Sequence, residues 1–212
     1  MKRFLGTALA LVLCFTGEMA AASARTYGFL THAAFFSLES KQPNLIDPQV
    51  FTADVASIGA IGPQGIVHVA GYRPAYGVDD PATQITNAQG KSLGLTLGQW
   101  FLARGTAELS QEETHTRAKL SFSNLVPGGR YSLFENHFAA ANVTFTPLDG
   151  AGKTNSFTAD AKGTATLTVI LPVVLSHAEA ILLVFHSDGM DHGTERGALG
   201  ITAHHQLIMR VP

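Results

Sequence analysis

The polar loop at 186–192 carries the residues of this chain that are best suited to chemistry. An apolar run at 182–185 leads into His186, and Asp188, Asp191 and His192 follow within the next six positions. Imidazole nitrogens and carboxylate oxygens bind transition metals, and the same groups carry protons. Functional groups are often placed on a loop that a rigid strand holds in position. His186, Asp188 and His192 are therefore candidate metal ligands.

A second pair of candidate ligands, Glu135 and His137, lies in a different predicted strand. Side chains repeat on one face of a strand every two residues, so these two can point at one metal or proton site. The only cysteine, Cys14, falls in a predicted signal segment, so the mature chain must bind any metal through nitrogen and oxygen. The alternative is that all these groups are hydrogen-bonded polar residues at the rim of a β-sandwich.

The remaining histidines carry weaker signals. His204 and His205 are neighbours on a predicted strand, where they face opposite sides, so at most one can join a given site. A structural role is expected for both. The other four stand apart from any cluster in the sequence and are expected to be satisfied polar residues or solvated loop residues: His32, His68, His115 and His177.

Several function classes lack their signatures. Ser187 follows His186 directly, where neighbouring strand residues diverge, and no Gly-x-Ser-x-Gly elbow is present. The glycine-rich stretch at 193–200 lacks the spacing and the following helix of a phosphate loop. The net charge is −2 and only 14% of residues are charged, which gives no electrostatic case for binding nucleic acid.

The first 24 residues have the three-part pattern of a secretory signal. Lys2 and Arg3 precede an apolar run at 4–15, and a small-residue cleavage site stands at 22–24. The run is shorter than the about 20 apolar residues that span a bilayer. We therefore expect export to the periplasm or outside the cell, and no membrane span.

Hydrophobic periodicity predicts an all-β protein. Apolar and polar residues alternate at 118–123, 164–171 and 206–211, and glycine-rich turns separate these runs. The segment 180–185 is apolar on both faces, as expected for a central strand that is covered on both sides. An Asp-Ala-Lys-Gly sequence at 160–163 predicts a hairpin turn. The pattern favours a sandwich or a barrel.

The N-terminal part, residues 25–102, has a different pattern. Strand-like runs occur at 27–38, 49–56 and 66–72, and the polar, turn-rich segment 73–90 is expected to be a long loop. A short helix is predicted at 97–104, where Gly105 stops it. Trp100 and Phe101 are expected to anchor the core where the two parts of the chain join.

The segment from Ala103 to Ala203 resembles the copper/zinc superoxide dismutase-like β-sandwich family. The matching pieces come in the family's order: ARGTAELSQ at 103–111, AKLSFSNLVPGGRYSLFENHF at 118–138, NSFTADAKGTA at 155–165, LVFH at 183–186 and RGALGI at 196–201. The resemblance implies a Greek-key sandwich over 103–212, preceded by a β extension at 25–102. It covers about half of the chain.

The resemblance also implies roles for individual residues. His137 matches the second histidine of the family's His-x-His copper pair, and Glu135 stands where the first would be. His186 matches the last copper ligand, and Arg196 matches the arginine that guides superoxide. No histidine lies between His137 and Asn155, so the bridging and zinc ligands of the family are missing. Copper is therefore the expected cofactor, and zinc is not.

These observations together predict an exported, divergent member of the family. It would bind a transition metal, copper above all, through Glu135, His137 and His186, with Asp188 and His192 completing the site. Arg196 would be the catalytic residue if dismutase chemistry remains, although the missing ligands favour metal binding over fast catalysis. The alternative is a metal-free, secreted β-sandwich that presents its loops to a partner.

Overall fold

The computed structural model describes residues 24–138 and 142–211. The predicted signal segment lies outside these ranges except for its last residue. Nearly all regular structure is antiparallel β-sheet, as the periodicity predicted. Within the described residues, no helix is long and apolar enough to cross a membrane.

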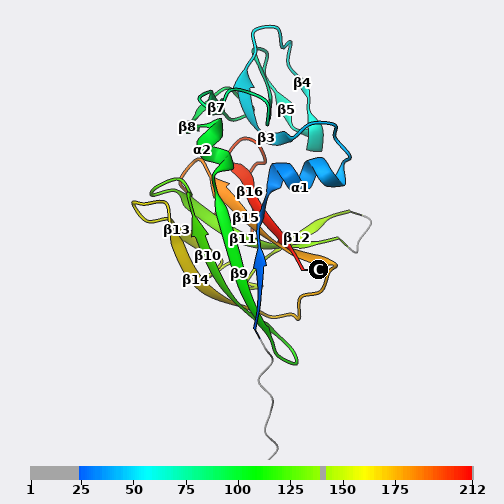
Figure 1. The fold of residues 1–212 in the computed structure, drawn as a ribbon, viewed down its shortest axis with the longest axis vertical. Coiled ribbons are helices and arrows are strands. Elements are labelled where there is room, and N and C mark those ends of the chain that lie inside the picture. The colour runs from blue at the N-terminus through cyan, green and yellow to red at the C-terminus, as the bar shows by residue number, and fades with distance from the viewer. Residues whose placement is uncertain (1–23, 139–141, 212) are drawn as a thin grey trace, which may run out of the picture.

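Two antiparallel sheets pack face to face and enclose the main core (Figure 1). In order across the first sheet, its strands are β1 (Arg25–Gly28), β9 (Arg104–Gln111), β10 (Thr116–Ser123) and β14 (Ala165–Leu171). The second sheet has the order β12 (Thr144–Pro147), β11 (Arg130–His137), β15 (Glu179–His186), β16 (Ala203–Arg210) and β2 (Leu30–Thr31), with β13 (Ser156–Thr158) also paired to β11. The all-β prediction is confirmed, in an arrangement consistent with a β-sandwich.

Burial along the strands follows the alternation in the sequence. On β10, Ala118 and Leu120 are fully buried while Lys119 is exposed. The central position of β15, between β11 and β16, is also confirmed. Its Ile181 and Leu183 enter the main core, whereas Ala180, Leu182 and Val184 enter a second core on the outer face of the sheet, which Phe35 of α1 (His32–Glu39) helps to cover.

The first strands of the N-terminal part belong to the sandwich. β1 pairs with β9, and β2 pairs with β16, so residues 25–31 add an edge strand to each sheet. The rest forms a separate four-stranded sheet at the far end of the molecule in Figure 1. Its order is β6 (Tyr72–Tyr76), β3 (Ile46–Ala53), β7 (Gln84–Thr86) and β8 (Ser92–Thr96), with a small hairpin of β4 (Ala60–Ile61) and β5 (Val67–His68) beside it, joined by a 3₁₀ turn at Pro63–Gly65.

Two expectations for this part are wrong. The predicted strand at 27–38 gives way to helix α1, because the Thr31 side chain accepts a hydrogen bond from the backbone of Ala34 and the helix packs against β3 and β16. The predicted loop at 73–90 contains β6 and β7. Pro74 fits in β6 because this strand is at the edge of its sheet, where a missing N–H is tolerated.

The predicted hairpin at 160–163 is also wrong in its connection. The turn exists, and the Gly163 backbone N–H donates to the Asp160 carbonyl. It joins β13 of one sheet to β14 of the other, so it crosses the sandwich instead of linking paired strands.

The predicted anchor at the join of the two parts is confirmed for Trp100. Helix α2 (Leu97–Phe101) begins at a capping box formed by Thr96 and Gln99, and ends three residues before the predicted Arg104. Trp100 is almost fully buried, and its indole N–H donates to Asp47 Oδ2 at 2.8 Å. This contact connects α2 to β3.

Candidate metal site at the end of strand β15

His186 is the last residue of β15 and lies opposite Arg130 of β11. Its side chain is 1% exposed, and its Nε2 atom is 2.6 Å from the hydroxyl of Ser132. The other ring nitrogen, Nδ1, is buried and has no hydrogen-bond partner among the described residues. Burial first, and then the neighbouring His192, lowers the pKa of His186 to about 4. The imidazole is therefore neutral near pH 7, which is the state that binds a metal.

The loop after β15 brings two more ligand groups to His186. The Nε2 atom of His192 is 3.0 Å from Asp188 Oδ2, and the His186 and His192 rings are 4.9 Å apart between centroids. Each of these three residues offers a ligand atom, and these atoms all lie within 4.8 Å of one another. His186 forms the buried base of the group, and Asp188 lies at the exposed side. Solvent ions thus have access to it.

The loop itself is fixed by Asp191, the second aspartate of the segment 186–192. Asp191 Oδ2 accepts hydrogen bonds from Arg130 and from the Ser156 hydroxyl, both at 2.5 Å, and Oδ1 accepts from the Gly193 backbone. The bond from Ser156 is the main reason why the pKa of Asp191 falls to about 2. Asp191 therefore attaches the loop to β11 and β13, and Asp188 and His192 are held close to His186.

The predicted single site with Glu135, His137 and His186 is wrong. In the antiparallel pairing of β11 with β15, His137 lies opposite Glu179, whereas His186 lies opposite Arg130 at the other end of both strands. Seven residues of strand separate the two ends, which corresponds to about 23 Å. The five predicted ligands therefore divide into two groups.

Glu135 and His137 form their own group with Glu179. Their ligand atoms lie within 4.8 Å of one another, and the His137 Nδ1 atom is 3.6 Å from Glu135 Oε1. Burial raises the pKa of the Glu135 carboxyl, His137 lowers it and Glu179 raises it further. Glu179 already accepts two hydrogen bonds from Ser176, and His137 contacts Thr146 at 2.9 Å. Two of its three members therefore already have hydrogen-bond partners within the protein.

Arg196, the predicted catalytic residue, contacts neither group through a hydrogen bond or ion pair within the described chain. Its guanidinium carbon lies 3.3 Å from the centre of the Phe145 ring, and its Nη1 atom is 3.2 Å from His205 Nε2. Burial lowers the pKa of Arg196 to about 10. Its side chain thus packs between β12 and β16.

His204 and His205 are buried where β16 meets β3, and Gln49 of β3 contacts both. The Gln49 carbonyl lies 2.9 Å from His204 Nδ1, and its side-chain Oε1 accepts from the His205 backbone N–H at 2.7 Å. Burial lowers the pKa of His204 to about 4 and that of His205 well below 6.5. These contacts agree with the structural role expected for both residues.

His32 does not stand alone, contrary to the prediction. Its ring lies 4.9 Å from that of His205 and its Nδ1 atom is buried without a partner among the described residues. Burial lowers its pKa to about 3. Sequence spacing gave no signal for this contact, because it depends on α1 packing against β16.

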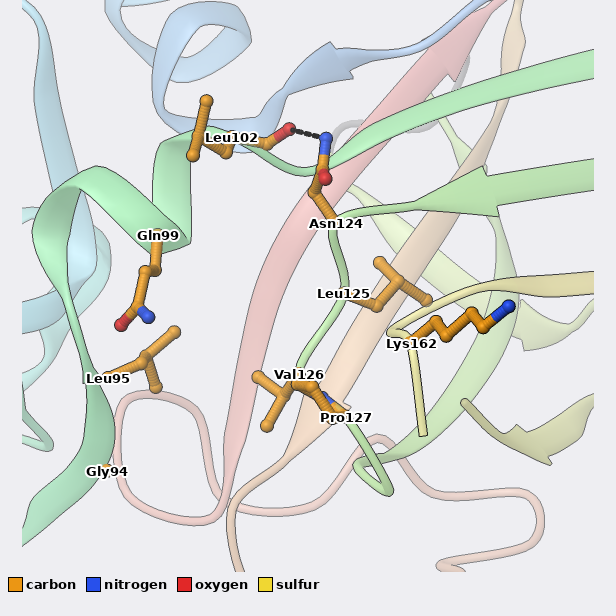
Figure 2. A pocket seen from close by; sticks show the side chains of 9 residues that line it. All are labelled: Gly94, Leu95, Gln99, Leu102, Asn124, Leu125, Val126, Pro127 and Lys162. Carbon is orange, nitrogen blue, oxygen red and sulfur yellow. Dashed lines mark hydrogen bonds between the residues drawn. The ribbon is translucent and has the colours of Figure 1, made fainter. Parts of the chain in front are cut away.

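A pocket of about 270 Å³ lies between the N-terminal sheet and the sandwich (Figure 2). It is lined by Gly94, Leu95, Gln99, Leu102, Asn124, Leu125, Val126, Pro127 and Lys162. The amide of Asn124 donates to the Leu102 carbonyl at 3.1 Å, which bridges its two walls. Lys162 is the only titratable group of this lining, so the pocket offers no acid–base pair.

Comparison with known proteins identified no relative. No protein-family model matches the chain, and searches of curated proteins and of solved structures found no match.

Proposed function

We propose that this protein is an exported β-sandwich that binds a transition metal ion, with copper preferred, through His186, Asp188 and His192. The observation that carries the proposal is the buried Nδ1 atom of His186, which has no partner among the described residues. A buried polar atom without a hydrogen bond is costly, and a metal ion would satisfy it. Two further ligand groups, Asp188 and His192, each have a ligand atom within 4.8 Å of one of the His186 ring nitrogens.

The contact with Ser132 supports a ligand role for His186. If the Nε2–H donates to the Ser132 hydroxyl, the lone pair on Nδ1 remains free for a metal. Histidine ligands are commonly oriented in this way by a hydrogen bond to the second ring nitrogen. Ligand atoms around one ion are at most about 4 Å apart, since each bond is about 2 Å long. Small rotations of Asp188 and His192 would achieve this.

The donor set favours copper among the common divalent ions. Two imidazoles and one carboxylate suit copper, zinc and iron, and copper(II) is bound most tightly by such ligands. Three protein ligands would leave a position open for water or a small anion. The proposed role is metal binding, as part of a divergent superoxide dismutase-like, Greek-key family member. Dismutation is not favoured, because the family's bridging and zinc ligands are missing and Arg196 packs on Phe145.

Metal content and copper titration of the purified mature protein test this proposal. We expect about one copper ion per chain in the wild type, and loss of binding in His186→Ala and His192→Ala. His137→Ala is the matched control, because it removes a histidine from the other group and should bind normally. Absence of stoichiometric copper in the wild type, or equal loss in all three variants, would contradict the proposal.

A superoxide-consumption assay on the copper-loaded protein separates the enzyme from the carrier. We expect a rate no greater than that of free copper at the same concentration. A faster rate that disappears in Arg196→Gln would restore the dismutase interpretation.

A further inference from the structure

The hairpin of β4 and β5, with the turns beside it, forms an apolar tip. We use this name for residues 55–71. The tip lies at the end of the molecule remote from β9, β10 and β14 (Figure 1). It contains no aspartate, glutamate, lysine or arginine. Seventeen uncharged residues in sequence are unusual for an exposed segment of a soluble protein, where surfaces are normally rich in charge.

Aliphatic side chains of the tip point into solvent. Val55 is fully exposed and Ile58 is 92% exposed. Ile61 and Val67 lie opposite each other in the hairpin, and both are mostly exposed. Val69, two residues after Val67, is partly exposed. The other face of β5 is buried, because His68 packs on Phe51. An exposed strand face normally carries polar residues, and here it is aliphatic instead.

Two polar side chains of the tip are hydrogen-bonded to strands of the N-terminal sheet. The Ser57 hydroxyl donates to the Tyr72 carbonyl at 2.6 Å, and the Gln64 amide oxygen accepts from Gln49 at 2.7 Å. Several backbone N–H groups are paired as well: those of Ser57, Gly62, Val69 and Gly71 donate to backbone carbonyls. These polar groups therefore lose little when water is removed from the tip, which is the condition for entering an apolar medium.

We propose that the apolar tip inserts into the surface of a lipid bilayer made of uncharged or zwitterionic lipids. Residues 55–71 carry no charge, so they can enter the boundary between headgroups and acyl chains without burying one. For the same reason they are not attracted to anionic lipid. The tip exposes five large aliphatic side chains, whereas a stable dimer buries about 800 Å² per subunit.

Its composition also argues against a protein partner. Binding energy at protein interfaces is concentrated in tryptophan, tyrosine and arginine, and residues 55–71 contain none of these. Valine and isoleucine side chains on a projecting hairpin suit a fluid apolar medium, which needs no complementary shape.

Charged residues next to the tip set the depth of insertion. Arg73 forms ion pairs with Asp54 at 3.3 Å and with Asp79 at 2.8 Å. Tyr72 and Tyr76 lie beside this group on β6, and the Arg73 guanidinium is 5.1 Å from the Tyr76 ring centre. Tyrosines prefer the boundary between headgroups and hydrocarbon. The tip would thus enter the bilayer until Tyr72, Arg73 and Tyr76 reach this boundary.

Co-sedimentation of the purified protein with phosphatidylcholine vesicles tests the proposal. We expect wild-type protein to bind, with no loss at 1 M salt because no charge pair is involved (a Debye length of about 3 Å at 1 M). The double variant Ile58→Ser, Val67→Ser should partition at least tenfold more weakly. Both residues are exposed, so the variant should fold normally, as circular dichroism can confirm.

The matched control is Leu38→Ser, which removes an aliphatic side chain that is 71% exposed on α1, outside the tip. It should bind vesicles like the wild type. Three outcomes would overturn the proposal: no vesicle binding by the wild type, equal loss in the control, or a wild-type dimer in analytical ultracentrifugation that the double variant abolishes. Metal binding by His186 does not enter this test, so the two proposals can fail separately.

Discussion

His186 illustrates how one hydroxyl can decide the chemistry of a histidine. The imidazole has two nitrogens, and a neutral ring carries only one proton. Ser132 contacts Nε2 at 2.6 Å, which leaves Nδ1 as the ring nitrogen without a hydrogen bond among the described residues. Ser132 is itself buried. It acts by positioning His186.

Ser132→Ala tests this role at the scale of one atom. We expect the affinity for copper(II) to fall by about 10–100-fold, because the ring loses the bond that orients it. Isothermal titration with copper measures the change. Ser121→Ala, a change in β10 of the opposite sheet, should leave the affinity unaltered. If Ser132→Ala binds copper as tightly as the wild type, the hydroxyl does not position the ligand.

At the scale of elements, the turn at 160–163 shows how the two sheets are connected. Gly163 has a positive φ of 71°, and a Cβ atom added to it would lie 2.2 Å from the Leu125 carbonyl oxygen. The turn therefore approaches the backbone after β10 more closely than any other residue type allows. The Gly163 carbonyl also accepts from the Leu125 backbone N–H at 2.9 Å.

Gly163→Ala should destabilise the protein by clearly more than about 1 kcal/mol, because the turn must move away from Leu125. Urea unfolding measures the loss. Gly128→Ala is the matched control: this glycine also has a positive φ, of 68°, and an added Cβ meets nothing within 4 Å. It should cost only the backbone strain. Equal losses in the two variants would show that the contact with Leu125 contributes nothing.

At the scale of the whole molecule, buried histidines join the N-terminal sheet to the sandwich. His32, His204 and His205 are held neutral, with pKa values below those of the unfolded chain. The unfolded state therefore binds more protons below pH 6.5, and stability is lost as the pH falls from 6.5 towards 4. Burial raises the pKa of Asp47 to about 6, which acts in the opposite direction between pH 3.8 and 6. Burial also raises the pKa of Glu135 and lowers that of His186 to about 4, so four histidines oppose two carboxyls.

The free energy of unfolding should accordingly fall by at least about 1 kcal/mol per pH unit between pH 6.5 and pH 5. His32→Phe should reduce this slope, because it removes one titrating group. The substitution breaks no hydrogen bond of the buried Nδ1 atom, which has none within the described structure. Urea titrations at several pH values measure the slope. An unchanged slope in His32→Phe would refute the account.

Sequence reasoning succeeded where local periodicity decides the structure. The alternation at 118–123 and the doubly apolar segment 180–185 predicted β10 and β15, because a strand needs only the two-residue repeat to place its side chains. The polar loop at 186–192 was also found from composition alone. The strand prediction failed at 32–38. Apolar residues occupy consecutive positions there, and packing on β16 selects a helix.

Some features of this protein follow from local residue patterns, and others depend on contacts between residues distant in sequence. Residue types and their spacing were sufficient to predict strands such as β10 and β15, the turn at 160–163 and the candidate ligands His186, Asp188 and His192. Only the tertiary structure decided that Glu135 and His137 lie at the opposite end of β11 from His186, because antiparallel register is set by core packing between strands distant in sequence. The same holds for His32 beside His205, and for the outward direction of the aliphatic side chains in the apolar tip.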